Sequence, residues 1–334
     1  MKLPGGIWLR AIVSIALLAV LGVFFVDWRE TGAALAACRW EYMALLALWI
    51  TVDRAMMSYK WTVLIKARGM AISQATALRA YYLGTFTGCF LPSTVGGDAV
   101  RVGAATGPGR ASEALAASVL MERALGFVAA ALFALLAVLL LVGILGGAPR
   151  SVLWWAVALP TAAIFAVLAS FSGAAARFME RAAGWLQDKG KLAGWAGRFL
   201  TAYAAYRGHG RALAWFTVLS FLEQVVPPVG TWLAALALNI DLSFLTAFAV
   251  APVALLFTRI PVSVSGFGVV EGLYVAFFAM VGVSATDAFL LGLVANLSIV
   301  AATAPGAVLF YLGGWGKESQ AKDGAPEDGT IQNK

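Results

Sequence analysis

The chain has 334 residues, of which 61% are apolar and 12% are charged, with a formal net charge of +7. A typical soluble domain is about 25% charged. The composition therefore excludes a water-soluble fold and predicts an all-α polytopic membrane protein, whose helices satisfy their own backbone hydrogen bonds in lipid. One His and two Cys are too few for a metal site or a disulfide framework. Neither a metal nor a cofactor is expected.

Apolar runs predict six full spans, since a helix crosses a bilayer with about 20 apolar residues. The first run, Ile7–Val26, is followed by no small-residue cleavage site, so we interpret it as an uncleaved span. The other spans are Tyr42–Ile65, a segment that starts at residue 114 and is fully apolar over Ala124–Leu145, Val152–Phe171, Ala212–Leu238 and Ala288–Leu312. Residues 1–316 are expected to form one membrane-embedded domain, and the polar residues 317–334 a disordered cytoplasmic tail.

Two regions are not simple spans. Ser73–Gly109 and Leu242–Val283 each contain helical stretches broken by proline and glycine. One model makes each broken region a re-entrant helical hairpin, with one hairpin dipping in from each face of the membrane. The other makes Leu242–Arg259 and Val262–Val283 full crossings, which gives eight spans with the same parity. The sequence leaves both models open.

The basic residues predict the orientation. Lys60–Arg110 holds six basic residues and one acid, and Ser172–Arg211 holds seven basic residues and two acids. Basic loops stay on the cytoplasmic side, so both termini are expected inside, in a bacterial inner membrane. Ser172–Arg211 also alternates basic and aromatic residues, which is typical of an interfacial amphipathic helix. A solvated linker is the alternative.

The two broken segments resemble each other, which makes an inverted repeat one interpretation. Pro92–Asp98 and Pro261–Glu271 both run from proline through hydroxyl residues and paired glycines to a carboxylate. Broken helices at corresponding positions of two halves point to a transporter's binding site. The substrate-path candidates are Pro92, Gly96, Gly97, Asp98, Arg101, Glu122, Arg123, Arg259, Pro261, Ser263, Ser265, Gly266, Gly268 and Glu271.

The paired glycines are expected to open the helices that hold Asp98 and Glu271. Such helix N-termini favour an anion, for example a lipid phosphate, although the two carboxylates could equally cap the helices. Glu122 and Arg123 could be path residues or an anchor at the cytoplasmic interface. Arg259 could pair with Glu271 or bind a headgroup phosphate. The sequence does not identify partners for the other charges within predicted spans, which are Asp53, Arg54 and Glu223.

Three stretches, Leu91–Arg101, Ser118–Arg123 and Arg259–Gly272, carry a resemblance to a known family. In their order and at these helix boundaries they resemble the lysylphosphatidylglycerol synthase transmembrane-region family, also called flippase-like domain proteins. The resemblance covers about Ile7 to Leu312 and indicates a stand-alone member without the soluble aminoacyl-transferase domain. It implies lipid handling, because in the two-part enzymes this domain is associated with flipping the modified lipid. Stand-alone relatives are associated with isoprenoid-linked sugars and hopanoids.

The leading hypothesis is a lipid flippase that moves an anionic or glycosylated lipid between leaflets without ATP hydrolysis, since no G-x-x-x-x-G-K-[ST] motif is present. One alternative is a membrane-embedded transferase that acts on a lipid-linked donor, with a carboxylate as general base. Another is a non-catalytic partner of a lipid-synthesis enzyme. A transporter is favoured over an enzyme. The expected partners are membrane lipids of anionic, isoprenoid or hopanoid type and a lipid-synthesis enzyme, with no nucleic acid.

Overall fold

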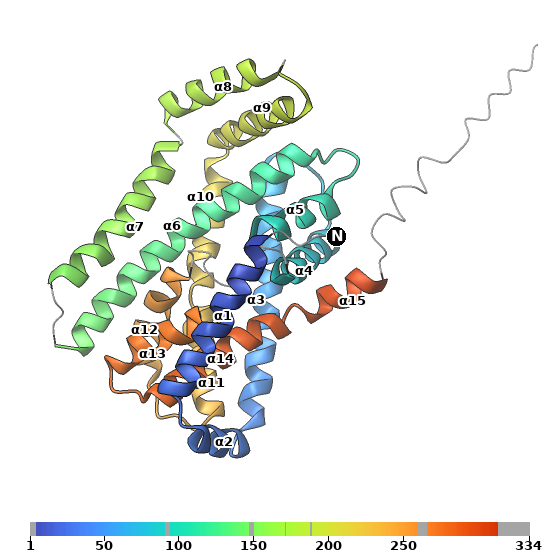
Figure 1. Ribbon diagram of the computed structural model, residues 1–334. Coiled ribbons are helices and arrows are strands. Elements are labelled where there is room, and N and C mark those ends of the chain that lie inside the picture. The colour runs from blue at the N-terminus through green and yellow to red at the C-terminus, as the bar shows by residue number, and fades with distance from the viewer. Residues whose placement is uncertain are drawn as a thin grey trace, which may run out of the picture.

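The computed structural model describes residues 5–90, 94–146, 150–170, 172–187, 189–258 and 266–312. These ranges consist of helices joined by short connections, and no strand occurs within them (Figure 1). The all-α fold is therefore confirmed. The predicted tail, residues 317–334, lies outside the described residues.

The α-helices range in length from 9 residues in α2 and α15 to 33 residues in α6. The first half of the chain contains α1 (Gly5–Phe24), α2 (Trp28–Ala36), α3 (Trp40–Ala67), α4 (Gln74–Phe90), α5 (Thr94–Ala105) and α6 (Ser112–Ile144). The second half contains α7 (Arg150–Ser170), α8 (Gly173–Gln187), α9 (Lys191–Ala204), the short 3-10 helix η1 (Ala205–Gly208), α10 (Gly210–Glu223), α11 (Val226–Ala237), α12 (Phe244–Phe257), α13 (Val269–Ala279), α14 (Ala285–Ala301) and α15 (Ala304–Leu312). A helix or two consecutive helices lie over each of the six predicted spans.

Several helical stretches have the length and composition of membrane spans. Among the described residues, three are long and apolar enough to cross a bilayer: α6, α10 with α11 over Gly210–Ala237, and α14 with α15 over Ala285–Leu312. A fourth counts if Ile12–Phe24 and α2, which meet at 96°, form one broken span. α3 has 28 residues but carries charges at its centre. The prediction of a membrane protein with several spanning helices is confirmed, whereas the choice between six and eight spans stays a prediction.

The segment between the first two predicted spans contains the short helix α2, which lies at 96° to the preceding helix. Asp27 caps α2, because its Oδ1 accepts from the backbone N–H groups of Arg29 at 2.8 Å and Glu30 at 3.3 Å. The indole Nε1 of Trp28 donates to the carbonyl of Gly22 at 2.9 Å, which ties α2 back to α1. The sequence contains the signal for this helix, since an Asp N-cap followed by a Glu in the first turn starts a helix.

α4 and α5 form an antiparallel helical pair that meets through glycines. A Cβ added at Gly84 would lie 2.8 Å from the carbonyl of Gly97, and one added at Gly97 would lie 2.9 Å from Cα of Gly88. The two backbones are therefore in direct contact, as small residues permit in membrane helices. The expectation that Gly96 and Gly97 open α5 was wrong, because α5 begins at Thr94 and Gly97 packs against α4 instead.

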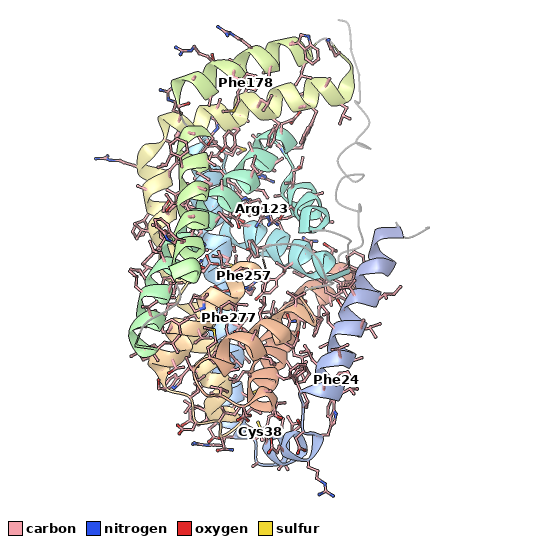
Figure 2. The ribbon with its side chains drawn as sticks, turned by 60° about the vertical axis from the view of Figure 1, so that its left-hand side comes forward. Phe24, Cys38, Arg123, Phe178, Phe257 and Phe277 are labelled. Carbon is pink, nitrogen blue, oxygen red and sulfur yellow. The ribbon has the colours of Figure 1, made fainter. Side chains whose placement is uncertain are left out.

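The α4–α5 pair starts and finishes at one end of the molecule. After α5, the guanidinium of Arg110 donates to the carbonyl of Ala71, which precedes α4, at 3.2 Å. The indole of Trp195 in α9 donates to Ser112 at the start of α6 at 3.4 Å, so this end is the one covered by α8 and α9. Figures 1 and 2 show α8 and α9 at one extreme of the molecule and α2 at the other.

The α12–α13 pair starts and finishes at the α2 end. Before α12, the amide of Asn239 donates to the carbonyl of Ala37 at 2.8 Å. After α13, Thr286 accepts from the backbone N–H of Asp27 at 3.0 Å. The two broken regions thus begin from opposite ends of the molecule, as opposed hairpins require. Their re-entry into a membrane stays a prediction.

Ser172–Arg211 is mostly helical. α8 packs on α9, where a Cβ at Gly197 would lie 2.8 Å from the carbonyl of Ala183. α9 in turn is tied to α6, because Arg198 pairs with Glu113 at 2.6 Å. The residues expected in either an amphipathic helix or a solvated linker therefore form a helical pair, and their position at a membrane interface stays a prediction.

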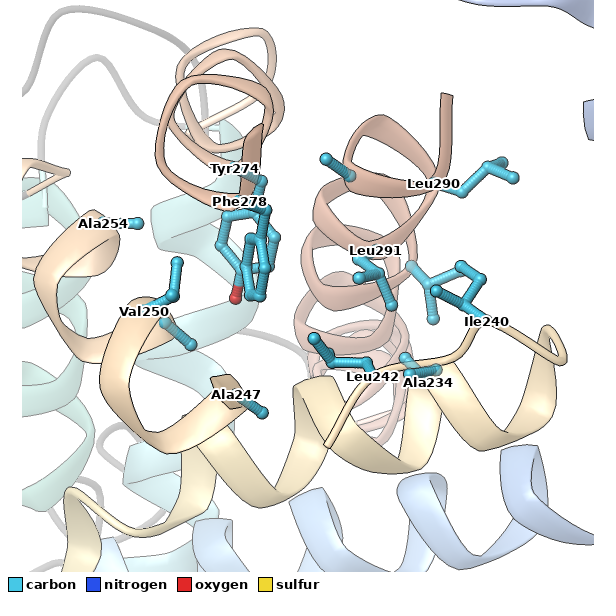
Figure 3. Packing of buried hydrophobic residues seen from close by; sticks show 14 of the residues in the cluster. Ala234, Ile240, Leu242, Ala247, Val250, Ala254, Tyr274, Phe278, Leu290 and Leu291 are labelled. Carbon is cyan, nitrogen blue, oxygen red and sulfur yellow. The ribbon is translucent and has the colours of Figure 1, made fainter. Parts of the chain in front are cut away.

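The interior contains both small and large apolar residues, and further large apolar residues lie on the outer surface. The main buried cluster joins α11, α12, α13 and α14, and Figure 3 shows Ala234, Ala247 and Ala254 beside Leu291 and Tyr274. Lipid tails are as apolar as leucine, so burial gives membrane helices little driving force, and close packing of small residues holds them together. The large side chains on the outer surface include Leu136, Leu139, Phe165 and Leu168.

We expect Gly97→Ala to destabilise the protein, because the new methyl group would overlap the backbone of α4. Overpacking of this kind costs about 1–3 kcal/mol, and a thermal unfolding curve of the purified protein would show a lower midpoint. Gly103→Ala is the matched control on the same helix, because its Cβ would meet nothing within 4 Å. It should be neutral or slightly stabilising. Equal midpoints for both variants would contradict the glycine contact.

Candidate functional site

Two ion pairs join α5 to α6 side by side. Asp98 and Arg101 are three residues apart on α5 and therefore share one face. Arg101 donates through Nη1 and Nη2 to the two oxygens of Glu122, at 3.2 and 2.8 Å. Arg123, the next residue on α6, donates to Oδ2 of Asp98 at 2.6 and 2.5 Å. Figure 2 shows Arg123 between the α8–α9 end and Phe257 along the length of the molecule.

The Arg101–Glu122 pair is buried and held rigidly. Arg101 is 5% exposed and Glu122 is 9% exposed. The guanidinium carbon of Arg101 lies 4.5 Å from the ring centre of Trp61 and 4.8 Å from that of Tyr81. Such cation–π contacts strengthen when the charge is removed from water. Trp61 is itself fixed, since its indole donates to Ser118 at 2.9 Å. The pair therefore locks α3, α4, α5 and α6 together.

A second group of charges lies on α3 and α10. Lys60 forms an ion pair with Glu223 and donates to the hydroxyl of Ser220 at 3.1 Å. Asp53 and Arg54 pair at 2.5 Å, and Asp53 is 3% exposed. Charges at this depth are expensive unless paired, and in membrane proteins they usually mark a path or a partner. The expectation that Lys60 belongs to a cytoplasmic loop was wrong, because it is a buried residue within α3.

These charges line two adjoining cavities. The larger has a volume of about 360 Å³, with walls from α3, α4, α5, α6 and α14 and from Glu223 at the end of α10. The smaller has a volume of about 170 Å³ and lies among α3, α11, α12, α13 and α14. Arg54, Glu223, Gln224 and Ile299 line both. The two cavities therefore adjoin at these four residues. The volume of the larger one falls in the range of small-ligand sites, about 300–1,000 Å³.

Glu271 lies beside the smaller cavity and acts as a helix cap. Its Oε2 accepts from the backbone N–H of Gly268 at 2.6 Å, and its Oε1 accepts from the amide of Asn296 at 3.3 Å. Gly268 is the N-cap of α13 with φ +82°, so this glycine does open the helix as expected. A Cβ at Gly268 would also lie 2.5 Å from Cβ of Leu17, which fixes α13 against α1.

The predicted path residues fall into three groups. Those on the wall of the larger cavity are Gly97, Asp98, Arg101, Glu122 and Arg123. Those described but away from that wall are Gly96, Gly266, Gly268 and Glu271. Those outside the described residues are Pro92, Arg259, Pro261, Ser263 and Ser265. The structure therefore gathers the α5–α6 candidates in one place, and it separates them from the described residues of the second segment.

Several lining residues were not among the candidates. Lys60 was counted as a loop residue, and Asp53, Arg54 and Glu223 were left without partners. The spacing of Asp53 and Lys60 carried a usable signal, because residues seven apart lie on one face of a helix. A carboxylate and an amine on one face of an apolar span predict a polar cavity against that face.

The chain matches the model of a known protein family. The family model of the lysylphosphatidylglycerol synthase TM region matches residues 7–306, and the chain belongs to that family. The match covers nearly the whole chain and confirms the resemblance noted for the sequence. It indicates a membrane function related to lipids. No curated protein matches the chain.

We expect Glu122→Gln to lower stability by about 3–5 kcal/mol, because removing one partner of a buried ion pair leaves the other charge uncompensated. The free energy of unfolding, measured in detergent micelles by denaturant titration, would show it. Glu113→Gln is the control, since its partner Arg198 is mostly exposed, and an exposed pair contributes about 1 kcal/mol or less. A Glu122 variant as stable as the Glu113 variant would contradict a locking role.

Proposed function

We propose that this member of the lysylphosphatidylglycerol synthase TM region family carries lipid headgroups between the leaflets of a membrane without hydrolysing ATP. The observation that carries the proposal is a cavity of about 360 Å³ lined by Arg54, Lys60, Asp98, Glu122 and Glu223 together with two further arginines, within a helical membrane protein. A headgroup needs polar contacts to cross hydrocarbon, whereas its acyl chains do not. A cavity with charged walls between lipid-facing helices supplies such contacts.

The arrangement of the broken helices supports the same proposal. The α4–α5 pair starts at the α8–α9 end and supplies part of the cavity wall, while the α12–α13 pair starts at the α2 end and borders the smaller cavity. Binding sites between broken helices of opposite origin are typical of transporters that expose one site alternately to each side. We take the two pairs as the opposed re-entrant elements of such a cycle.

The geometry restricts the transferase alternative. A general base must place a free oxygen within reach of the proton that it removes. Both oxygens of Glu122 are held by Arg101, and both oxygens of Glu271 accept bonds from Gly268 and Asn296. A transferase would therefore rely on another carboxylate of the cavity wall, such as Asp98, which Arg123 contacts only at Oδ2. Lipid mass spectrometry of a deletion strain separates the two functions. Loss of a lipid species would favour the transferase, and an unchanged composition with altered leaflet distribution would favour transport.

Translocation would be measured in proteoliposomes with phospholipids that carry a fluorophore on an acyl chain, and with dithionite outside to bleach the outer leaflet. We expect Gly126→Leu to slow translocation at least about tenfold, which corresponds to about 1.4 kcal/mol of barrier. Gly126 lies on the cavity wall, and its Cβ would point into open space, so the new side chain fills the cavity.

Gly143→Leu is the matched control for that experiment. Gly143 is on the same helix, its Cβ also meets nothing within 4 Å, and it lines neither cavity. The control should keep the wild-type rate. If both variants kept it, the cavity would not be the path. If wild-type protein moved no lipid faster than protein-free vesicles did, the proposed function would fail.

We further propose that the α8–α9 end faces the cytoplasm of a bacterial inner membrane and that the α2 end faces outward. The basic segments gather at the former, as Arg198 on Glu113 illustrates, and basic segments stay inside. Cys38 lies at the opposite end (Figure 2). In right-side-out vesicles of a Cys89→Ser variant, an impermeant maleimide should label Cys38. Labelling only after the vesicles are permeabilised would reverse the orientation.

The environment of the Cys38 thiol also predicts how the labelling rate depends on pH. Partial burial raises the pKa of the Cys38 thiol, and the nearby Glu41 carboxylate adds to the rise. The thiolate is the reactive form, and a raised pKa means less thiolate at neutral pH. The labelling rate should therefore keep rising through the alkaline range, beyond the pH at which an unperturbed thiol levels off. An early plateau would contradict the raised pKa.

A further inference from the structure

The four cations on the wall of the larger cavity are all paired, so the four pairs together carry no net charge. Lys60 pairs with Glu223, Arg101 with Glu122 and Arg123 with Asp98, all on the same wall, and Arg54 pairs with Asp53, which lines the smaller cavity. The anionic headgroup that the basic segments suggest would therefore meet no uncompensated cation among the described residues. It would leave the occupied cavity with a net negative charge, which is costly at membrane depth.

The two pairs between α5 and α6 differ in how readily they open. Arg101 and Glu122 are bound to each other at two points, and the guanidinium of Arg101 lies over two aromatic rings. In the other pair the side chain of Arg123 is 48% exposed and that of Asp98 is 20% exposed, and both contacts end on one oxygen, Oδ2. An exposed ion pair contributes little net stability. It can therefore separate at small cost while its neighbour keeps the helices in place.

We propose that the Asp98–Arg123 pair binds the headgroup by exchange and that the headgroup is zwitterionic, with a phosphate and a primary ammonium. The inference rests on the proposed lipid-carrying function. The phosphate binds Arg123, whose planar guanidinium matches phosphate oxygens, and the ammonium binds Asp98. Two intermolecular ion pairs replace one intramolecular pair, so the net charge of the occupied cavity stays zero. An unpaired anion or an uncharged sugar cannot make this exchange.

Cys89 offers a direct readout of occupancy, because it lies on the wall of the same cavity. In a Cys38→Ser background it is the remaining cysteine of the chain, and its alkylation rate in detergent reports whether the cavity is filled. We expect dihexanoyl phosphatidylethanolamine to protect Cys89 at a concentration about tenfold lower than dihexanoyl phosphatidylglycerol, a difference of about 1.4 kcal/mol. The two lipids share their acyl chains and differ in headgroup charge. Equal protection, or better protection by phosphatidylglycerol, would overturn the proposal.

A third probe identifies the source of the headgroup. Glycerophosphoethanolamine carries the same two charges and no acyl chains. We expect weak protection by it, because a lipid gains further contact from its chains. Protection by this soluble molecule at the same concentration as by the lipid would overturn a lipid as the ligand.

Single charge variants should shift the preference in opposite directions. Asp98→Asn leaves Arg123 as a free cation and should move the order toward phosphatidylglycerol. Arg123→Gln leaves a free carboxylate and should weaken phosphatidylglycerol further. Glu113→Gln is the matched control, since its pair with Arg198 also joins two helices and lies outside both cavities. It should keep the wild-type order. A shift in the same direction for both site variants would overturn the exchange.

Binding and translocation separate the two proposals. Cys89 protection in detergent needs no translocation, whereas the dithionite assay does. A zwitterion preference in protection without any translocation would support this site and refute the flippase function. Translocation that favours phosphatidylglycerol, with the matching order in protection, would refute this inference and leave the flippase function intact.

Discussion

The rest of the structure depends on one constraint, which is that a charge buried inside a helical membrane protein must have a partner. Arg101 and Glu122 meet this constraint most completely, since they bind at two points and the guanidinium of Arg101 also lies against the rings of Trp61 and Tyr81. Their pairing requires α5 to lie against α6, and the stacking requires α3 and α4 to close around the guanidinium. Four helices are therefore positioned by a single side chain. The apolar packing elsewhere has no comparable directional contact, because apolar side chains interact without a fixed geometry.

The same constraint gives the cavity a polar wall, but each described cation on that wall is already paired and does not attract a further anion. Lys60 and Glu223 bring α3 to α10, and Asp53 and Arg54 pair at the boundary between the two cavities. Each contact stabilises the helix arrangement and at the same time leaves a polar wall. The same ion pairs therefore stabilise the fold and line the proposed binding site. The pairs differ in exposure, and the Asp98–Arg123 pair is the one proposed to exchange partners.

Much of the fold could be predicted from the sequence, because apolar runs and charge distribution determine it in a membrane. The helices over the six predicted spans follow from the apolar runs, although the number of spans stays a prediction. Local chemistry was harder to use. Gly97 looked like a helix breaker but serves as a contact surface, since the role of a glycine depends on what approaches it. From the sequence, Glu271 could cap a helix or bind a substrate, and the hydrogen bonds from Gly268 and Asn296 show that it caps α13.

The α4 side of the cavity is built from Tyr81, whose ring lies against Arg101, and from the small residues Gly84, Thr85, Gly88 and Cys89. Along the small residues the backbone itself is close to the boundary, so rotamer changes there can do little to widen the opening. The width of the cavity is therefore set by the position of α4, and a bulkier headgroup would have to displace α4 as a rigid body. α15 would move with it, because Gly306 lies directly on the backbone of Tyr82. The last helix of the chain is thereby mechanically linked to the width of the cavity.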